Sequence, residues 1–210
     1  DGNVSALAEQ RHGAARGKQH VVLLTLGTGV GGGLVIDGKS FRGATGSGAE
    51  LGHITVLADG PPCQGFCPNL GCLETMVSGT AIARDAVARA EAEPDSSLAR
   101  LLSEGREITG ALVTELAHGG DSIAVEVLAQ AGHYLGTGIV SLVNTFNPEV
   151  IVIGGGAAAA GDLMLDPARK IVRERALQPN RDLCEIVPAH FGAEAGMLGA
   201  AVMAFDEFFS

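Results

Sequence analysis

Short runs of β-branched and aliphatic residues alternate along the chain with longer segments of helical periodicity. The apolar runs have the length of buried strands, and they predict strands over 21–26, 34–36, 53–56, 150–153 and 184–187, with a further short strand ending at Phe41. Asp37-Gly38 is a typical hairpin dipeptide and predicts a tight turn before that short strand. Apolar residues at intervals of three and four predict helices over 3–15, 73–92, 97–103, 109–117, 121–144, 163–176 and 193–209.

The order of these elements predicts the fold class. Antiparallel strands come first, and strands that alternate with helices follow, which is typical of an α/β domain with a mixed sheet. The helices of 73–144 form an insertion between the third and fourth strands.

Composition narrows the class of protein further. The 210 residues carry a formal net charge of −10, with 46% apolar and 18% charged residues, which excludes wholesale disorder. No apolar run reaches the ~20 residues of a membrane helix, and no charged-then-apolar leader opens the chain, so we expect a cytoplasmic protein with no membrane partner. The acidic charge disfavours nucleic acid as a partner, and the lack of Trp argues against a platform for stacking bases.

Two glycine clusters lie at strand ends. The segment 27–33 holds five glycines and one Thr between two predicted strands, so it is either a nest of N–H groups for nucleotide phosphates or a flexible hairpin. Gly154-Gly155-Gly156 follows an apolar strand, at the end of the sheet where α/β proteins bind ligands, and the alternative is a tight strand-to-helix turn.

One histidine and three cysteines have the residue types and spacing of a metal site. The set matches a closed tetrahedral zinc site and consists of His53, Cys63, Cys67 and Cys72. The Pro and Gly residues between them predict a loop that a bound metal would stabilise. Four protein ligands leave no open position, so the zinc is expected to be structural. The alternative is three incidental reduced cysteines. The fourth, Cys184, is interpreted as a core residue.

Two carboxylates bracket this loop. Glu50 precedes His53 by three residues, and Glu74 follows Cys72 by two. A metal-fixed loop would hold these side chains so that they direct several hydrogen bonds to sugar hydroxyls, whereas a lone Glu is more often solvated surface.

Four segments resemble the ROK family of repressors, open reading frames and sugar kinases. They are Asp1–Glu9, Leu26–Gly33, the pair Gly48–His53 and Cys63–Glu74, and Pro148–Gly156, and they occur in the family's order. One departure is the interval between Cys63 and Cys67, which holds Gln64-Gly65-Phe66 where the commonest family spacing has a single residue.

The resemblance implies an actin-like, hexokinase-type (ribonuclease H-like) fold and, most of all, a bacterial glucokinase that transfers phosphate from ATP with Mg²⁺ to the 6-hydroxyl of glucose. It implies that Asp1 is the catalytic base and that Asn3, Glu50, His53 and Glu74 bind the sugar. His53 would then also be a zinc ligand with Cys63, Cys67 and Cys72. The nucleotide contacts implied are Thr28, Gly29, Gly31, Gly154, Gly155 and Gly156.

The family's first domain, with its Asp-x-Gly-Gly-Thr phosphate loop, has no counterpart in the chain. Residues 1–210 are therefore expected to be the C-terminal portion of a two-domain sugar kinase, with half of a cleft and no activity by itself. Three alternatives stay open: a sugar-responsive repressor, a kinase for another hexose or N-acetylhexosamine or with polyphosphate as donor, and a zinc-stapled sugar-binding domain. The apolar stripe of the last helix predicts a patch that pairs with a second copy, hence a homodimer; it includes Phe205, Phe208 and Phe209.

Overall fold

The structure, a computed structural model, describes residues 2–192 and 195–209 and is built on a mixed five-stranded sheet. The strands lie in the order β3-β2-β1-β4-β5. β1 pairs antiparallel with β2 and parallel with β4, while β3 is antiparallel to β2 and β5 is parallel to β4. This arrangement confirms the predicted α/β class. The strands are β1 (Val21–Leu26), β2 (Val30–Ile36), β3 (Lys39–Ser40), β4 (Val150–Gly154) and β5 (Glu185–Pro188).

Hydrophobic cores cover both faces of β1, the central strand of the sheet. Side chains alternate between the faces of a strand, so Val22 and Leu24 enter one core while Val21 and Leu23 enter the other. A strand in this position needs an unbroken apolar run, which is what the sequence of β1 supplies.

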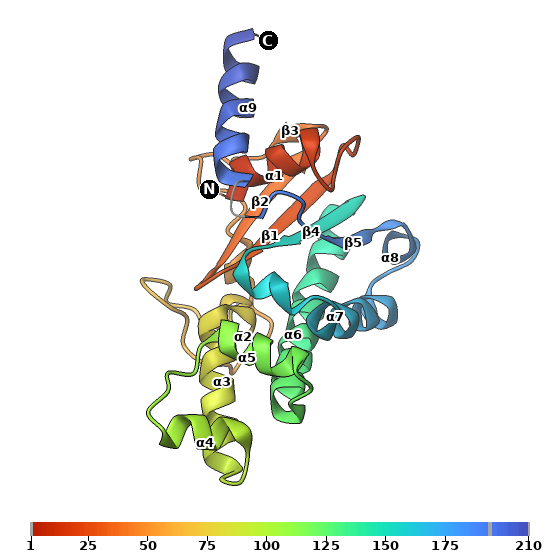
Figure 1. Ribbon diagram of the computed structural model, residues 1–210. Helices are drawn as coiled ribbons and strands as arrows, with labels where there is room; N and C mark the ends of the chain where they lie inside the picture. Colours follow the sequence, from red (N-terminus) through yellow and green to blue (C-terminus); the bar gives the residue numbers. More distant parts are fainter. Residues whose placement is uncertain (1, 193–194, 210) are drawn as a thin grey trace.

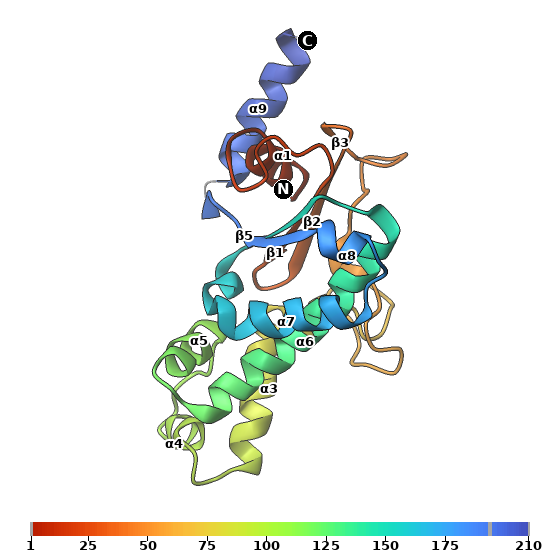
Figure 2. The same ribbon diagram turned by 90° about the vertical axis from the view of Figure 1, so that its right-hand side faces the viewer.

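Helices cover both faces of the sheet (Figures 1 and 2). On one side lie α1 (Gly2–His12) and α9 (Ala195–Phe209), and on the other lie α6 (Ser122–Phe146) and α7 (Asp162–Arg175). A lobe of further helices extends away from the sheet and lies within the range 73–144. It consists of α2 (Glu74–Val77), α3 (Gly79–Ala92), α4 (Ser97–Ser103) and α5 (Gly110–His118), and the remaining short elements are η1 (Leu51–His53), η2 (Gly156–Ala160) and α8 (Asn180–Leu183).

Polar caps set where α3, α4, α5 and α6 begin. At each of these helices the side chain of the N-cap residue accepts a hydrogen bond from the backbone N–H three residues later, and the four caps are Ser78, Ser96, Thr109 and Asp121. Ser78 is fully buried and extended, so it divides the predicted helix 73–92 into α2 and α3.

The prediction of a strand over 53–56 is wrong. His53 ends the 3₁₀ turn η1, and Thr55 forms only an isolated bridge with Cys72. Gly52 packs so closely on the backbone of Val30 that no side chain would fit there. The chain therefore turns away from the sheet at this point and runs beside the cysteine loop.

β2 begins at Val30, earlier than predicted, so Gly31, Gly32 and Gly33 belong to the strand and pair with β1. These glycines permit close packing. A Cβ on Gly32 would lie 2.7 Å from Leu51 Cγ, and one on Gly33 would lie 2.7 Å from Ala6 Cβ. Because such approaches are too short for real side chains, glycine lets η1 and α1 pack directly on the strand backbone.

One buried carboxylate anchors α1. Glu9 is fully buried, and its Oε2 accepts a hydrogen bond of 2.8 Å from the amide of Ala14. Its Oε1 accepts two more, each of 2.9 Å, from the amides of His190 and Phe191. Three N–H donors compensate a charge that is otherwise costly to bury, and they join α1 to the segment between β5 and α9.

The close packing of α1 and α9 follows from another glycine, Gly199, where a Cβ would collide with the backbone of Val4. Met197 of α9 is exposed, and Val202 packs against the core beneath α1. The side chains of Phe205, Phe208 and Phe209 lie outside the described residues, so self-association through this helix stays a prediction.

Bilayer-spanning helices are not found among residues 2–192 and 195–209, since none there is both long and apolar enough. Cys184, interpreted from the sequence as a core residue, is half-buried at the end of α8. Burial nevertheless raises the pKa of its thiol to about 12.

The packing of α1 on β2 generates a stability prediction. Gly33→Ala forces the new methyl group into Ala6 and the first turn of α1. We expect the free energy of unfolding to fall by about 1–3 kcal/mol, the usual range for overpacking, in urea denaturation followed by circular dichroism. Gly156→Ala is the matched control, because a Cβ there meets nothing within 4 Å. Equal stability of the two variants would contradict the packing role of Gly33.

Candidate active site and metal centre

The four predicted metal ligands converge in the structure. Donor atoms of His53, Cys63, Cys67 and Cys72 all lie within 4.8 Å of one another. His53 Nδ1 is 3.4 Å from Cys63 Sγ, and the Sγ atoms of Cys67 and Cys72 are 4.0 Å apart. Zn–S bonds of ~2.3 Å in a tetrahedral site put two thiolates roughly 3.8 Å apart, so the donor set and its spacing fit zinc.

Backbone contacts shape the cysteine loop around this centre. Cys63 donates its amide hydrogen to the carbonyl of Asn69 at 2.9 Å, and the side chain of Asn69 donates to Thr55 Oγ1 at 2.8 Å. Gly71 has a φ of +57° and lies against the carbonyl of Leu57, a position in which a side chain would be both strained and blocked. The loop is therefore closed by hydrogen bonds at its base and by the ligand cluster within it.

The three thiols of the cluster differ in their pKa. Burial raises the pKa of Cys63 to about 12 and raises the pKa of Cys72 as well, while a backbone hydrogen bond from Asn69 lowers the pKa of Cys67. A bound metal ion would lower the pKa of all three thiols, because coordination deprotonates a thiol outright.

A cavity of about 500 Å³ opens beside the ligand cluster and is called here the metal-side cavity. Three of the four predicted sugar-binding side chains, Glu50, His53 and Glu74, line it together with Gln64, Gly65, Phe66 and Cys67. Glu50 is exposed, whereas His53 and Glu74 are half-buried. The structure thus collects two carboxylates and an imidazole around one space, with hydrogen-bonding groups suited to hydroxyls.

Asn3, the fourth predicted sugar contact, lies elsewhere. Asn3, in the first turn of α1, is not among the residues that line the metal-side cavity. Its Oδ1 is buried and has no hydrogen-bond partner among the described residues. Asp1, predicted as the catalytic base, lies outside the described residues.

Glu74 connects the metal-side cavity to the turn between β1 and β2. Its Oε2 accepts a 2.8 Å hydrogen bond from the amide of Val30. The same oxygen occupies the space that a side chain on Gly29 would need. Glycine at this position therefore allows the carboxylate to reach the turn.

The start of α3 holds the same turn from the other side. The amide of Gly79 donates to the carbonyl of Gly27 at 2.7 Å, and the Thr80 hydroxyl donates to the carbonyl of Thr28 at 2.9 Å. These bonds engage the carbonyls of the turn, whereas the amides of Thr28 and Gly29 have no acceptor among the residues that the structure describes. Such amides suit an anionic ligand.

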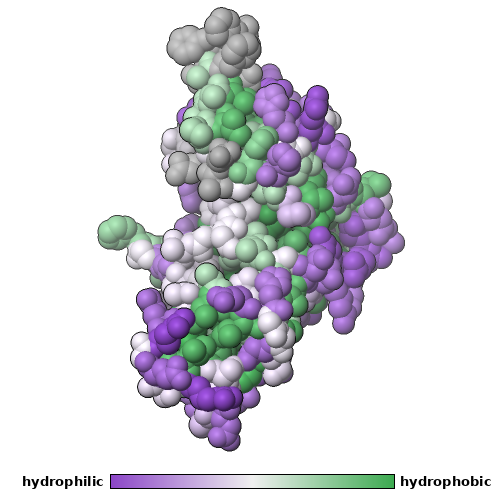
Figure 3. Space-filling model, in the orientation of Figure 1, coloured by the Kyte–Doolittle hydropathy of each residue, from purple (hydrophilic) through white to green (hydrophobic). Residues whose placement is uncertain are grey.

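A second cavity, of about 480 Å³, lies at this turn and is called the glycine-turn cavity. It brings Thr28 and Gly156 together from the two predicted glycine clusters. Two stretches that the sequence did not point to complete its wall, residues 79–83 and 107–111 of the helical lobe. Figure 3 shows a pale surface, near the middle of the hydropathy scale, where the hairpin of β1 and β2 meets this lobe.

The other predicted nucleotide contacts serve the sheet in this structure. Gly31 lies in β2 and pairs with Thr25 of β1, and Gly154 is buried at the end of β4. Gly155 has a φ of +85° and lies against the backbone of Leu26. Of these cluster residues, Thr28 and Gly156 line the glycine-turn cavity, and Gly29 lies in the turn itself.

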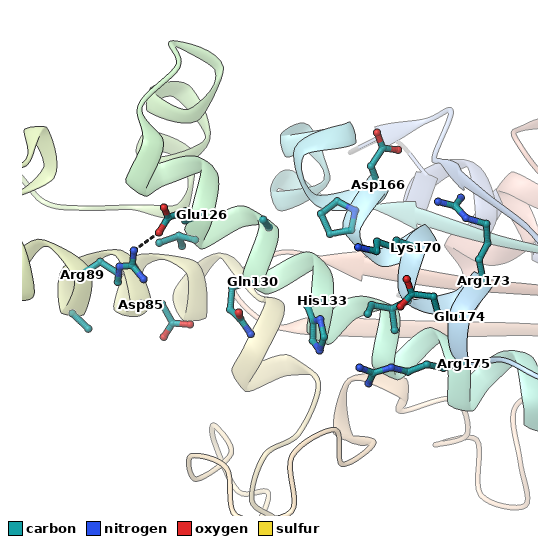
Figure 4. A pocket seen from close by; sticks show the side chains of 15 residues that line it. Asp85, Arg89, Glu126, Gln130, His133, Asp166, Lys170, Arg173, Glu174 and Arg175 are labelled. Atoms are coloured by element: carbon teal, nitrogen blue, oxygen red, sulfur yellow. Dashed lines mark hydrogen bonds and ion pairs between the residues drawn. The ribbon is translucent and has the colours of Figure 1, made fainter.

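A further groove, of about 1260 Å³, shares no lining residue with either cavity and lies between α3, α6 and α7 (Figure 4). Charged side chains of both signs line it, and an ion pair joins Arg89 to Glu126. None of the predicted site residues is among the described residues that line this groove, so the candidate site is the pair of cavities that Glu74 links through its hydrogen bond to Val30.

The comparisons with known proteins place the chain in a family. Residues 1–207 match the model of the ROK family, and the chain belongs to that family. It is similar to the glucokinase of Halalkalibacterium halodurans, with 40% identity over 95% of this chain and 60% of the relative. It is also similar to the structure of a ROK family glucokinase from Streptomyces griseus in complex with glucose and AMPPNP, with 37% identity, a TM-score of 0.86, and coverage of 96% of this chain and 65% of that one.

A ROK family transcriptional regulator, described as a homolog of the E. coli MLC protein, is about equally similar. Its structure has 36% identity and a TM-score of 0.86, with coverage of 97% of this chain and 50% of that one. The chain thus spans at most about two thirds of these relatives. The fold and family are shared by kinases and regulators.

We predict one zinc ion per chain in protein purified without added metal, measured by elemental analysis. Cys63→Ser removes one of four converging ligands and should lower the zinc content well below one and lower the Tm. Cys184→Ser is the control, since Cys184 lies outside the cluster and should leave the content unchanged. Wild-type protein that is free of metal and yet well folded would rule out a structural zinc.

A second prediction concerns Glu74. In Glu74→Ala the amide of Val30 loses its acceptor, and hydrogen bonds to charged groups contribute about 1.5–3 kcal/mol. Hydrogen exchange of that amide should become at least about 10-fold faster. Glu50→Ala is the matched control, because Glu50 lines the same cavity without a hydrogen bond to the turn. Unchanged exchange in Glu74→Ala would mean that the carboxylate does not hold the turn.

Proposed function

We propose that the protein is an ATP-dependent sugar kinase that phosphorylates glucose at the 6-hydroxyl, with residues 1–210 forming the part described above. The observation that carries this proposal is the position of Glu74. Its carboxylate lines the metal-side cavity and also bonds the turn whose residues line the glycine-turn cavity. A phosphoryl transfer needs two such neighbouring sites, since catalysis depends mainly on positioning the donor against the acceptor.

In this proposal one cavity binds the sugar and the other binds the nucleotide. Glu50, His53 and Glu74 bind hydroxyls of the sugar in the metal-side cavity, and Asn3, whose buried amide oxygen has no partner among the described residues, stays a predicted sugar contact outside that cavity. The amides of Thr28 and Gly29 bind phosphate oxygens, and the glycine-turn cavity receives the nucleoside. Zinc at the four-ligand cluster is structural, because its ligand set is complete.

In the proposed reaction Asp1 accepts the proton of the 6-hydroxyl. The sugar oxygen forms a bond to the γ-phosphorus of ATP while the bond from that phosphorus to the β–γ bridging oxygen breaks, which gives glucose 6-phosphate and ADP. Mg²⁺ on the nucleotide neutralises charge that develops on the phosphate oxygens. The carboxylate of Asp1 keeps the proton until solvent removes it.

A sugar-responsive repressor is the second candidate, and the similarity to a ROK family transcriptional regulator favours it. A repressor would use the metal-side cavity to sense a sugar but would need no catalytic base, so the carboxylate of Asp1 supports the kinase. A kinase for mannose, fructose or N-acetylmannosamine, with ATP or polyphosphate as donor, is compatible with the same two cavities.

The deciding experiment is a coupled assay of the full-length protein with ATP and a panel of sugars, run beside a DNA-binding assay. We expect ADP and glucose 6-phosphate in equal amounts, with glucose preferred over the other sugars. Sequence-specific DNA binding released by sugar, without any ADP formed, would replace the kinase proposal by the repressor.

For the base, we predict that Asp1→Asn in the full-length protein lowers kcat by roughly 10²- to 10⁴-fold, the usual contribution of a general base. The KM for glucose should change little, because an amide still hydrogen-bonds the hydroxyl. Asp37→Asn, in the exposed hairpin turn, is the matched control and should retain full turnover. If Asp1→Asn keeps kcat within a factor of about two, Asp1 is not the base.

A further inference from the structure

Phe66 stands at the tip of the cysteine loop and is fully exposed, with 106% of its reference area accessible. The next most exposed phenylalanine among the described side chains is Phe41, at 44%. The loop projects from the left of the molecule in Figure 1, and the surface that it presents there is apolar in Figure 3. Single exposed apolar residues are common, so exposure by itself assigns no role.

The place of Phe66 between two metal ligands is the second observation. Gln64, Gly65 and Phe66 form the whole interval between Cys63 and Cys67. The amide of Cys67 donates to the carbonyl of Gln64 at 3.4 Å, and Gly65 has a φ of +62°, so the interval is a tight turn. With both flanking thiolates on one metal ion, the turn holds its aromatic ring without support from a hydrophobic core.

The third observation is the cavity that this ring borders. Phe66 lines the metal-side cavity with Glu50, His53 and Glu74, and among the described residues it is the only large apolar side chain in that lining. The other lining side chains offer carboxylate, imidazole, amide and thiol groups. A hexose has a rim of hydroxyls and faces of C–H groups, so a site with polar groups alone leaves the C–H face in water.

We propose that Phe66 is the apolar wall of the sugar site and stacks on the C–H face of the pyranose ring. The ring electrons of an aromatic side chain present a negative face, which attracts the weakly positive C–H groups of a sugar. The turn is already fixed by the metal cluster, so little conformational entropy is lost when the sugar binds. The interval between Cys63 and Cys67 is two residues longer than the commonest family spacing, and in this proposal the added length brings an aromatic ring to the cavity.

This inference rests on the proposed sugar kinase, and its test separates the two. In the full-length protein, Phe66→Ala should raise the KM for glucose about 3- to 10-fold, the size of one aromatic stacking contact. The kcat and the KM for ATP should not change, and zinc should remain at one per chain. Phe66→Tyr should restore the wild-type KM, and Phe66→Leu should restore it only in part. Phe41→Ala, outside the cavity, is the control and should leave all constants unchanged.

Three outcomes distinguish the claims. A wild-type protein that turns over no sugar removes the proposed function and this inference with it. Turnover of glucose by Phe66→Ala with an unchanged KM and full zinc overturns the role of Phe66 alone. A fall in kcat without a change in KM also overturns it, because the ring would then act on a step other than sugar binding.

Discussion

The candidate site depends on the carboxylate of Glu74. This residue follows the ligand Cys72 by two positions and begins α2, so the metal loop and the helical lobe both fix where it lies. Its hydrogen bond to Val30 then fixes the turn between β1 and β2 relative to the metal-side cavity. A structural metal in this arrangement has an effect beyond its own loop, because any displacement of the loop reaches the turn through one side chain.

The loop between η1 and α2 has little apolar material to hold it in place. Leu57, Phe66 and Leu70 are all exposed, so the loop does not fold by burying a core of its own. Its order comes from backbone hydrogen bonds and from four donors directed at one point. Because metal binding supplies folding free energy to such segments, the loop is able to keep its polar and aromatic side chains on the cavity side.

The sequence predicts those parts of the molecule that are determined locally. The apolar run of β1, the helical periodicity of α6 and the spacing of His53 and the cysteines are local signals, and the structure bears them out. The glycines of β2 were predicted as a loop because glycine is typical of turns. Their actual role follows from the approach of α1 and η1, which are distant in sequence.

The same limit applies to the glycine-turn cavity. Thr28 stands in a recognisable glycine cluster, but the walls contributed by residues 79–83 and 107–111 carry no motif and arise only when the lobe packs against the turn. The strand predicted at 53–56 failed for a related reason. Gly52 packs on Val30 at this point, and the pattern of apolar residues does not predict that contact.

The buried carboxylate of Glu9 has a mechanical consequence. It accepts hydrogen bonds from the amides of His190 and Phe191, immediately before α9, and from Ala14 just after α1. The two helices also touch through Gly199 and Val4. The two helices thus contact each other directly, and Glu9 joins α1 to the segment that precedes α9. A substitution that displaces α9 is therefore expected to displace α1 and, through Gly33, the strand that leads back to the glycine turn.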